Sequence, residues 1–226
     1  MKRSIIFIIA LLAFSCKSER KPQSARASQE LTILDSIAFA HGFEQWKEVS
    51  QIQYTFNVDR DSNHFERSWT WKPQQNAITL VSGNDTLSYT RTIPLDSAYI
   101  QADQGFINDK YWLLAPFNLV WDRDSFSYTH QKESKAPISG ENMQQLTIVY
   151  KNEGGYTPGD AYDFYFNDDL IIREWAFREA NANEAGLITT WEDHIETQGI
   201  KIAKTHRRDT GNWTLYFDDI SIQPKN

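Results

Sequence analysis

Residues 51–58 read Gln-Ile-Gln-Tyr-Thr-Phe-Asn-Val and show the period that most of the chain repeats. Every second side chain is apolar: Ile52, Tyr54, Phe56 and Val58. Successive side chains of a β-strand point to opposite faces of a sheet, so this alternation predicts a strand with one buried face and one solvated face. Residues 65–71 repeat the pattern and predict a second strand of the same kind.

The same period recurs through the rest of the chain. Gly83, Asn84 and Asp85 separate residues 77–81 from residues 86–91, which predicts a hairpin. Further strands are predicted at residues 125–130, 145–151, 162–167, 170–178, 188–194, 200–206 and 213–217. A dozen or so short antiparallel strands predict a strongly curved sheet or partial barrel.

Two segments depart from the alternation. Apolar residues recur at helical spacing from Leu31 to Ala38, Gly42 can terminate that helix, and residues 43–49 predict a further turn or two. Residues 96–120 form a dense apolar segment interrupted by Pro116, which we interpret as helical insertions across the sheet. The predicted fold class is mainly β (α+β): a curved antiparallel sheet forming an incomplete barrel, with helices plugging its concave face.

The N-terminus has the features of an export signal. Lys2 and Arg3 precede an apolar run that ends at Phe14, and this run has about half of the roughly 20 apolar residues that a membrane-spanning helix needs. The polar composition of residues 17–29 is typical of a flexible tether. We therefore predict a signal peptide at 1–15, a tether at 16–29 and one folded domain at 30–226.

The sole cysteine, Cys16, stands where the apolar run ends. The sequence Leu-Ala-Phe-Ser-Cys at residues 12–16 resembles the lipobox of bacterial lipoproteins, which implies cleavage before Cys16 and its acylation with chains such as palmitate. The alternative is an unpaired cysteine in an ordinary secretory signal. Two or more acyl chains on one cysteine would hold the protein stably on a membrane.

Charge and motif content exclude several classes of function. The formal net charge is −7, and loss of Lys2 and Arg3 with the signal makes it −9, which disfavours nucleic acid as a partner. The five histidines occur singly, without HExxH or CxxC spacing. No GxSxG elbow and no glycine-rich phosphate loop is present. We therefore predict a protein that is not an enzyme, with no catalytic residue, no metal and no cofactor.

Aromatic residues make up 14% of the chain and are the remaining group of interest. The simplest interpretation is that they fill the core. A highly curved sheet with few helices is, however, difficult to fill with aliphatic side chains, and the remaining space tends to bind apolar molecules. We hypothesise that Arg67, on the strand face of Trp69, meets a ligand headgroup. The candidate cavity residues are Tyr54, Phe56, Arg67, Trp69, Trp71, Tyr89, Trp112, Phe117 and Trp175.

Three segments carry a resemblance to a known family: residues 40–46, 108–117 and 156–160. They resemble the LolA/LolB-like half-barrel lipoproteins, and more closely a group of uncharacterised bacterial lipoproteins of that shape. The resemblance implies an incomplete barrel around helices, with an apolar cavity for acyl chains; in LolA and LolB the cargo is another lipoprotein. LolB-type proteins carry an exposed apolar hook, for which Tyr156 is only a poor candidate. Lys17, in place of an aspartate after the cysteine, implies the outer membrane.

Three functions follow as hypotheses. The first is a membrane-anchored carrier or docking lipoprotein that binds an acyl chain, a lipid or a lipoprotein in the half-barrel. The second is a structural or interaction lipoprotein of the cell envelope, which has a filled core and binds another envelope protein. The third is an envelope hydrolase, which requires two carboxylates, or a histidine and a nucleophile, to converge in a pocket.

Overall fold

The computed structural model describes residues 31–92 and 94–225. The predicted signal peptide, the acylation site Cys16 and the whole of the predicted tether lie outside the described residues. Residues from Leu31 onward form a compact unit with its own hydrophobic core. The description below concerns this unit alone.

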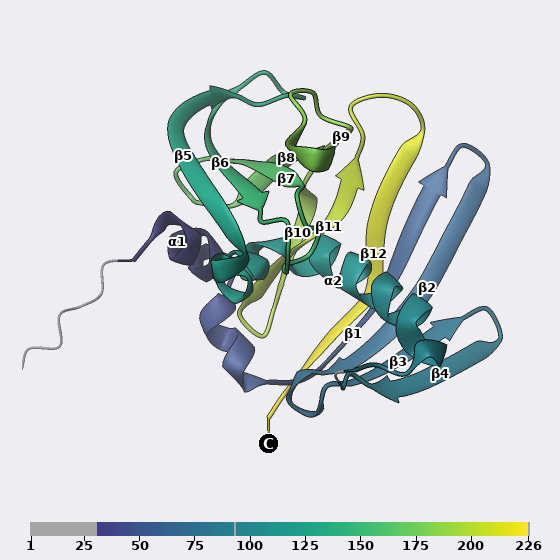
Figure 1. The fold of residues 1–226 in the computed structure, drawn as a ribbon. Coiled ribbons are helices and arrows are strands. Elements are labelled where there is room, and N and C mark those ends of the chain that lie inside the picture. Colours follow the sequence, from purple (N-terminus) through teal and green to yellow (C-terminus); the bar gives the residue numbers. More distant parts are fainter. Residues whose placement is uncertain (1–30, 93, 226) are drawn as a thin grey trace, which may run out of the picture. The chain divides into compact units, whose positions relative to one another are not determined.

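Two antiparallel sheets make up most of the unit (Figure 1). The larger has the order β10-β11-β12-β1-β2-β3-β4 and the smaller has the order β5-β6-β7-β8-β9. The strands are β1 (Val49–Arg60), β2 (Asn63–Lys72), β3 (Ala77–Ser82), β4 (Asp85–Thr90), β5 (Phe126–Lys135), β6 (Asn142–Tyr150), β7 (Ala161–Phe166), β8 (Ile172–Arg178), β9 (Leu187–Thr190), β10 (Glu192–Thr197), β11 (Ile200–Arg207) and β12 (Trp213–Pro224).

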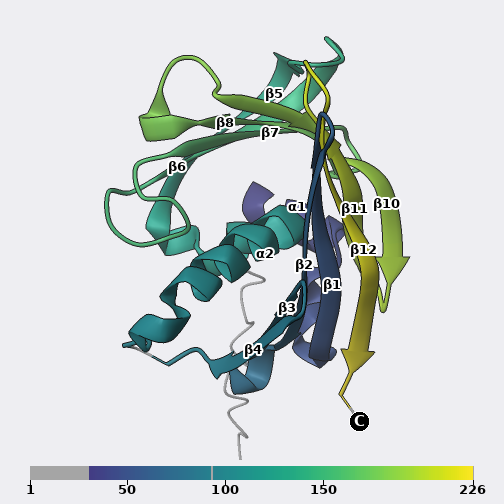
Figure 2. The same ribbon diagram turned by 90° about the vertical axis from the view of Figure 1, so that its right-hand side faces the viewer.

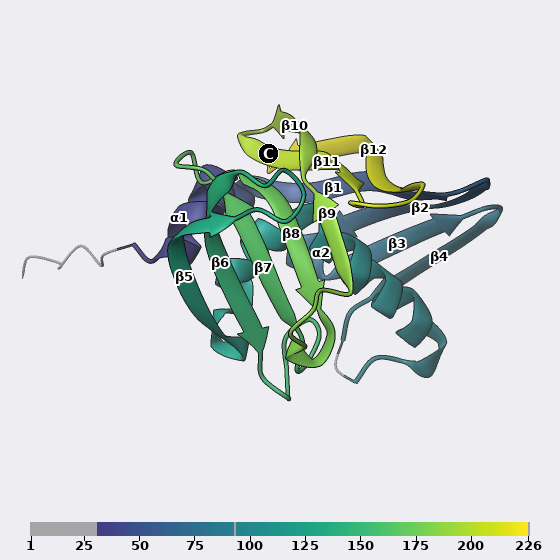
Figure 3. The same cartoon turned by 90° about the horizontal axis from the view of Figure 1, so that it is seen from above.

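The two sheets meet at one edge and are unpaired at the other. An isolated bridge joins Thr189 of β9 to Arg208, just beyond β11. No pairing among the described residues joins β4 to β5. Figure 3 shows β5 to β9 side by side, with α2 passing behind them. The predicted fold class, a curved antiparallel sheet forming an incomplete barrel, is confirmed.

Helices occupy the concave side, as predicted. The helix α1 (Ile33–Ala40) begins with a capping box in which the Thr32 side chain accepts from the Asp35 backbone and Asp35 accepts from Thr32. The long helix α2 (Ile100–Trp121) lies between the two sheets (Figure 2). The 3₁₀ helices are η1 (Phe43–Glu48), η2 (Pro73–Gln75), η3 (Ser97–Tyr99), η4 (Arg123–Ser125) and η5 (Glu179–Asn181).

The central helical insertions predicted for residues 96–120 are mainly one kinked helix. The backbone of Leu114 leaves the helical region, with φ −128° and ψ 28°, two residues before Pro116. Proline has no backbone N–H and its ring clashes with the carbonyl one turn earlier, so a kink is expected here. The kink directs the buried second half of α2 along the concave surface.

One predicted strand is wrong. Residues 188–194 were expected to form a single strand, but β9 ends at Thr190 and β10 begins at Glu192 in the other sheet. Trp191 lies between them and is 2% exposed. The chain changes sheets at this residue because its indole enters the core, where it contacts Trp175 and His206.

The main core is an aromatic-rich cluster between α2 and the sheets, and a smaller cluster contains Ala136, Met143, Tyr165 and Ala176. Phe106 of α2 is fully buried and packs edge-on between Trp69 and Trp71, with ring centroids 5.5 and 5.4 Å away.

No helix within residues 31–92 and 94–225 has both the length and the apolar character needed to cross a membrane.

Replacing Phe106 with alanine is expected to lower the free energy of unfolding by about 3–5 kcal/mol, because it leaves a cavity between α2 and β2. Urea denaturation of residues 30–226 measures the change. Gln104→Ala, at an exposed position of the same helix, is the control and should change stability by less than about 0.5 kcal/mol. Equal effects of the two variants would contradict this packing.

Candidate ligand-binding site

The predicted cavity residues lie in or against the main core. Seven of them are buried aromatic residues of the main core: Tyr54, Phe56, Trp69, Tyr89, Trp112, Phe117 and Trp175. Trp71 is half-buried and packs against this core, and Arg67 is half-buried. Much of the concave face is therefore filled by side chains of the sheet and of α2. Among the nine, only Trp112 and Trp175 border an apolar pocket between α2 and the smaller sheet.

This pocket has a volume of about 280 Å³ and lies between α2 and strands β7, β8 and β9. Its lining carries no charged side chain. It consists of Asn108 and Trp112 of α2, Tyr156 and Thr157 of the β6–β7 loop, Tyr162 of β7, Trp175 and Phe177 of β8, and Leu187 of β9. We name it the β7–β9 pocket. Its size is close to the lower limit of ligand cavities, which is about 300 Å³.

The β6–β7 loop forms one wall of the pocket. Tyr156 stacks on Tyr111 of α2, with ring centroids 3.9 Å apart, and its hydroxyl donates to Asn108 Oδ1 at 2.8 Å. Gly155 has φ +78°, and a Cβ at this position would lie 2.3 Å from the Tyr150 ring. The glycine therefore lets the loop approach the sheet. Tyr156 is turned inward and is not an exposed hook.

Six lining residues were not among the predicted cavity residues: Asn108, Tyr156, Thr157, Tyr162, Phe177 and Leu187. The alternation places Tyr162 on the face of Phe164, and Phe177 on the face of Trp175. This alternation could have added two of the six residues. Tyr156 and Leu187 depend on contacts of the β6–β7 loop with α2 and of β9 with β8, which local periodicity does not contain.

Arg67 points toward α2 and is held there by Asp109. Its Nε donates to Asp109 Oδ2 at 2.5 Å, and its Nη2 donates to Asp109 Oδ1 at 2.6 Å. Trp69 Nε1 donates to the same carboxylate at 2.7 Å. Asp109 is fully buried; burial raises its pKa, whereas the bonds from Arg67 act in the opposite direction. The guanidinium is thus used to hold the helix against β2.

Arg67 also borders a second hollow, of about 300 Å³. This hollow lies between strands β2 to β4 and the start of α2, and Phe65, Leu80 and Leu87 contribute to its lining. The bidentate pairing with Asp109 leaves Arg67 few free donors for a headgroup. The β7–β9 pocket is the better candidate site because its lining is uncharged and includes two of the predicted aromatic residues.

A buried histidine stands behind the β7–β9 pocket. The His206 ring lies 5.2 Å from that of Trp112 and 4.6 Å from that of Trp191, measured between centroids. Its Nδ1 donates to the backbone oxygen of Thr190 at 3.2 Å. Burial lowers the pKa of His206 to about 3. The ring is therefore neutral at pH 7, and this side of the pocket carries no charge.

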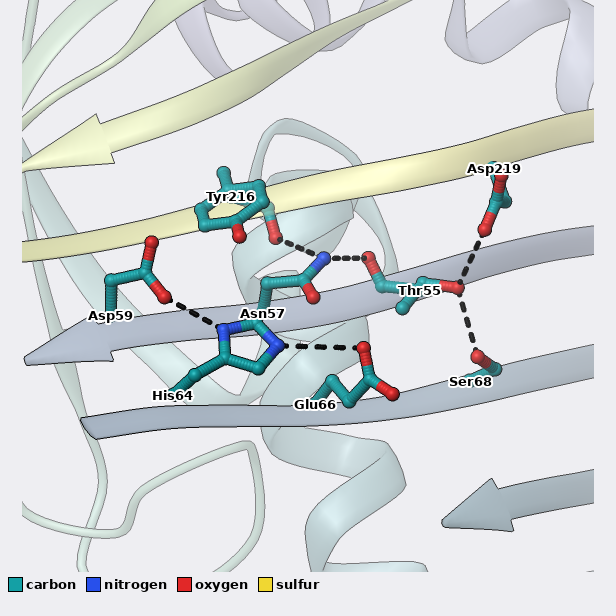
Figure 4. Close-up of polar contacts among 8 residues, drawn as sticks. All are labelled: Thr55, Asn57, Asp59, His64, Glu66, Ser68, Tyr216 and Asp219. Atoms are coloured by element: carbon teal, nitrogen blue, oxygen red, sulfur yellow. Dashed lines mark hydrogen bonds and ion pairs between the residues drawn. The ribbon is translucent and has the colours of Figure 1, made fainter. Parts of the chain in front are cut away.

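The convex face of the large sheet is polar (Figure 4). His64 contacts Asp59 at 2.7 Å through Nδ1 and Glu66 at 3.4 Å through Nε2, and the bond to Asp59 is the main cause of its raised pKa. Thr55 bonds to Ser68 and Asp219 on the strands beside it. No group of three or more histidine, cysteine, aspartate or glutamate residues within the described part of the chain could hold a metal ion.

Replacing Asp109 with asparagine is expected to destabilise the protein by roughly 3 kcal/mol or more, because the largely buried Arg67 loses its counter-charge. Equilibrium unfolding at pH 7 measures this change. Arg173→Ala, which removes an exposed ion pair with Asp169, is the control and should cost less than about 1 kcal/mol. An Asp109→Asn variant as stable as the control would show that the pair does not fix α2.

Acid should destabilise the fold through His206. An unfolded histidine binds a proton near pH 6.5, whereas His206 in the fold does so only near pH 3. The free energy of unfolding is therefore fully retained above about pH 6.5 and decreases as the pH falls toward 3, by up to about 1.4 kcal/mol per pH unit. His206→Phe should reduce this slope between pH 6.5 and 4.5; an unchanged slope would contradict the burial of a neutral ring.

Comparisons with known proteins find similarity only among solved structures. No protein-family model matches the chain, and neither does any curated protein. Among solved structures, a DUF1329 family protein from Desulfovibrio piger is 11% identical, with a TM-score of 0.48 over 84% of this chain and 92% of the other. A domain assigned as an outer membrane lipoprotein-sorting protein, from Vibrio parahaemolyticus, is 8% identical, with a TM-score of 0.46 over the same shares. The MucA/MucB complex of Pseudomonas aeruginosa is 10% identical, with a TM-score of 0.29 over 86% and 57%. The resemblance predicted from the sequence is thus found among structural neighbours.

Proposed function

We propose that the protein is a lipoprotein of the cell envelope that binds an acyl chain or a similar apolar ligand in the β7–β9 pocket. Its role is that of a carrier or docking protein, and we propose no catalytic role. The observation that carries the proposal is the pocket itself, an uncharged and largely aromatic hollow inside an unclosed barrel. Apolar side chains that border such a hollow lack packing contacts on one side, and an apolar ligand would supply those contacts.

Burial of hydrocarbon supplies the affinity in this proposal. Each methylene transferred from water contributes roughly 0.8 kcal/mol, so a short length of chain binds usefully without a charged partner. The volume of about 280 Å³ favours the insertion of part of one chain over a whole lipid.

The anchor supplies the location. We propose that Cys16 is acylated after removal of residues 1–15 and that the protein faces the periplasm from the outer membrane, since Lys17 follows the cysteine. Residues 17–29 could extend at most roughly 45 Å at about 3.5 Å per residue. The folded unit would then stay close to the acyl chains of the membrane.

A structural or interaction lipoprotein is the second candidate. It is favoured by the packing of Tyr54, Phe56, Trp69 and Phe117 into the core, together with the pairing of Arg67 with Asp109. If the core is already complete, the outer surface would bind an envelope partner. Ligand binding separates the two proposals.

The test is binding of a fluorescent fatty-acyl probe to residues 30–226. Leu187→Trp places a larger side chain in the β7–β9 pocket and should weaken binding by about ten-fold or more, because it displaces a stretch of chain worth at least ~1.4 kcal/mol. Leu80→Trp, which enlarges a half-buried residue in the second hollow, is the matched control and should bind as the unchanged protein does.

Two results would count against the proposal. Absence of probe binding, combined with absence of co-purifying lipid in native mass spectrometry, would favour the structural alternative. Loss of binding in Leu80→Trp alone would move the site to the hollow beside Arg67.

A further inference from the structure

Strand β5 ends the smaller sheet and has a partner strand on one side only. β6 pairs with it, and no strand within residues 31–92 and 94–225 pairs with its other edge. Figure 3 shows β5 as the outermost strand of the row β5 to β9. An unpaired edge presents a row of backbone N–H and C=O groups that can pair with a further strand. β5 therefore offers an edge at which another chain can dock.

Length and charge distinguish β5 from the other strands that end a sheet. It has ten residues, whereas β4 and β10 have six and β9 has four. β9 is also joined to the other sheet by the bridge from Thr189 to Arg208. β10 carries three acidic residues, Glu192, Asp193 and Glu196, which would repel those of a second copy. The longest open edge is thus that of β5.

Only the second half of β5 is protected against pairing. Residues 132–135 read Lys-Glu-Ser-Lys, and the register with β6 shifts between Gln131 and Ser134. Charged side chains and bulges are usual means by which proteins protect an edge. Residues 127–131 read Ser-Tyr-Thr-His-Gln, pair regularly with β6 and contain no aspartate, glutamate, lysine or arginine. The unprotected segment is therefore 127–131.

The apolar face of the smaller sheet continues onto this segment. Tyr128 is opposite Ile148 and His130 is opposite Leu146, and both β6 residues are fully buried in the main core. Tyr128 itself is 44% exposed, although its neighbour on the same face is not. A strand added beside β5 would cover the Tyr128 ring, because directly opposite side chains lie in contact. The edge therefore lacks a partner for its side chains as well as for its backbone.

The unprotected segment is complementary to a second copy of itself. An antiparallel pairing centred on Thr129 gives the pairs Thr129 with Thr129, Tyr128 with His130, and Ser127 with Gln131. Aromatic rings then meet on the core side, polar uncharged groups meet on the outer side, and no like charges are opposed. A pairing centred on Lys132 would instead place two lysines opposite each other. The charge pattern thus favours a second copy in the first register.

We propose that β5 is a self-association edge, through which two copies of the protein pair antiparallel over residues 127–131. The two-fold axis passes through the Thr129 pair. A symmetric contact of this kind uses the same surface on both copies and closes after two, so it gives a dimer and not a fibre. The smaller sheets join into one sheet of ten strands, five from each copy. The association requires no ligand in the β7–β9 pocket.

Disulfide formation tests the register directly. The sole cysteine, Cys16, is absent from residues 30–226, so introduced thiols can react only with each other. Thr129→Cys should form an intermolecular disulfide on mild oxidation, because directly opposite residues have Cα atoms about 4.5–5.5 Å apart, within the range of disulfides. A mixture of Ser127→Cys and Gln131→Cys should give mainly the heterodimer.

A charge at the two-fold axis should separate the copies. Thr129→Lys places two ammonium groups opposite each other and should raise the dimer dissociation constant about five-fold or more, as measured by analytical ultracentrifugation. Thr86→Lys makes the same change at an exposed position of β4, which ends the other sheet, and should leave the constant unchanged. Thr86→Cys is the matching control for the disulfide and should not crosslink. Circular dichroism checks that each variant is folded.

Hydrogen exchange tests the same contact without a substitution. Backbone N–H groups of residues 127–131 that face the open edge should exchange more slowly as the protein concentration rises. Those of β4 should exchange at a constant rate.

Three results would overturn the proposal. The first is a protein that sediments as a monomer and forms no disulfide in Thr129→Cys. The second is a dimer that Thr129→Lys does not weaken, and its weakening by Thr86→Lys would assign the contact to β4. The third is slow exchange of residues 127–131 at every concentration, which would show that a segment of the same chain covers this edge.

Discussion

The buried carboxylate of Asp109 holds the long helix inside the half-barrel. It receives two bonds from Arg67 and one from Trp69, so a single residue of α2 is tied to two residues of β2. Gly105, one turn earlier, lets the guanidinium approach, since a Cβ there would lie 2.7 Å from Arg67 Nη1. A second tie forms near the start of the helix, where Tyr89 donates to Asp103 at 3.1 Å. Both carboxylates are buried, so loss of either partner would leave a charge inside the protein without a counter-charge.

This attachment divides the concave face into two parts. On the side of β1 and β2, helix residues such as Phe106 and Phe117 fill the space against the sheet. On the side of β7 to β9, the helix presents Asn108 and Trp112, and a hollow remains. The same barrel therefore combines a solid half, which gives stability, with a partly open half, which can take a ligand.

Local periodicity predicted much of the fold, and contacts distant in sequence account for what it missed. Alternation located the strands, for example β1 and β2, because each has one buried face. It failed at Trp191, where residues 188–194 were predicted as one strand although the chain passes from one sheet to the other. The aromatic residues on the apolar faces of the strands lie in or against the main core. Which of them border a hollow depends on the path of α2, and that path depends on Asp109, whose partner is 42 residues away in sequence.

The central claim is that an acyl chain lies between α2 and the smaller sheet. Intermolecular nuclear Overhauser effects between a ¹³C-labelled acyl ester and the protein test it most directly. The account predicts contacts from the chain to the Leu187 methyl groups and to the rings of Tyr162 and Phe177. Contacts confined to Leu80 and Leu87 in the other hollow, or contacts only with the convex face, would contradict it.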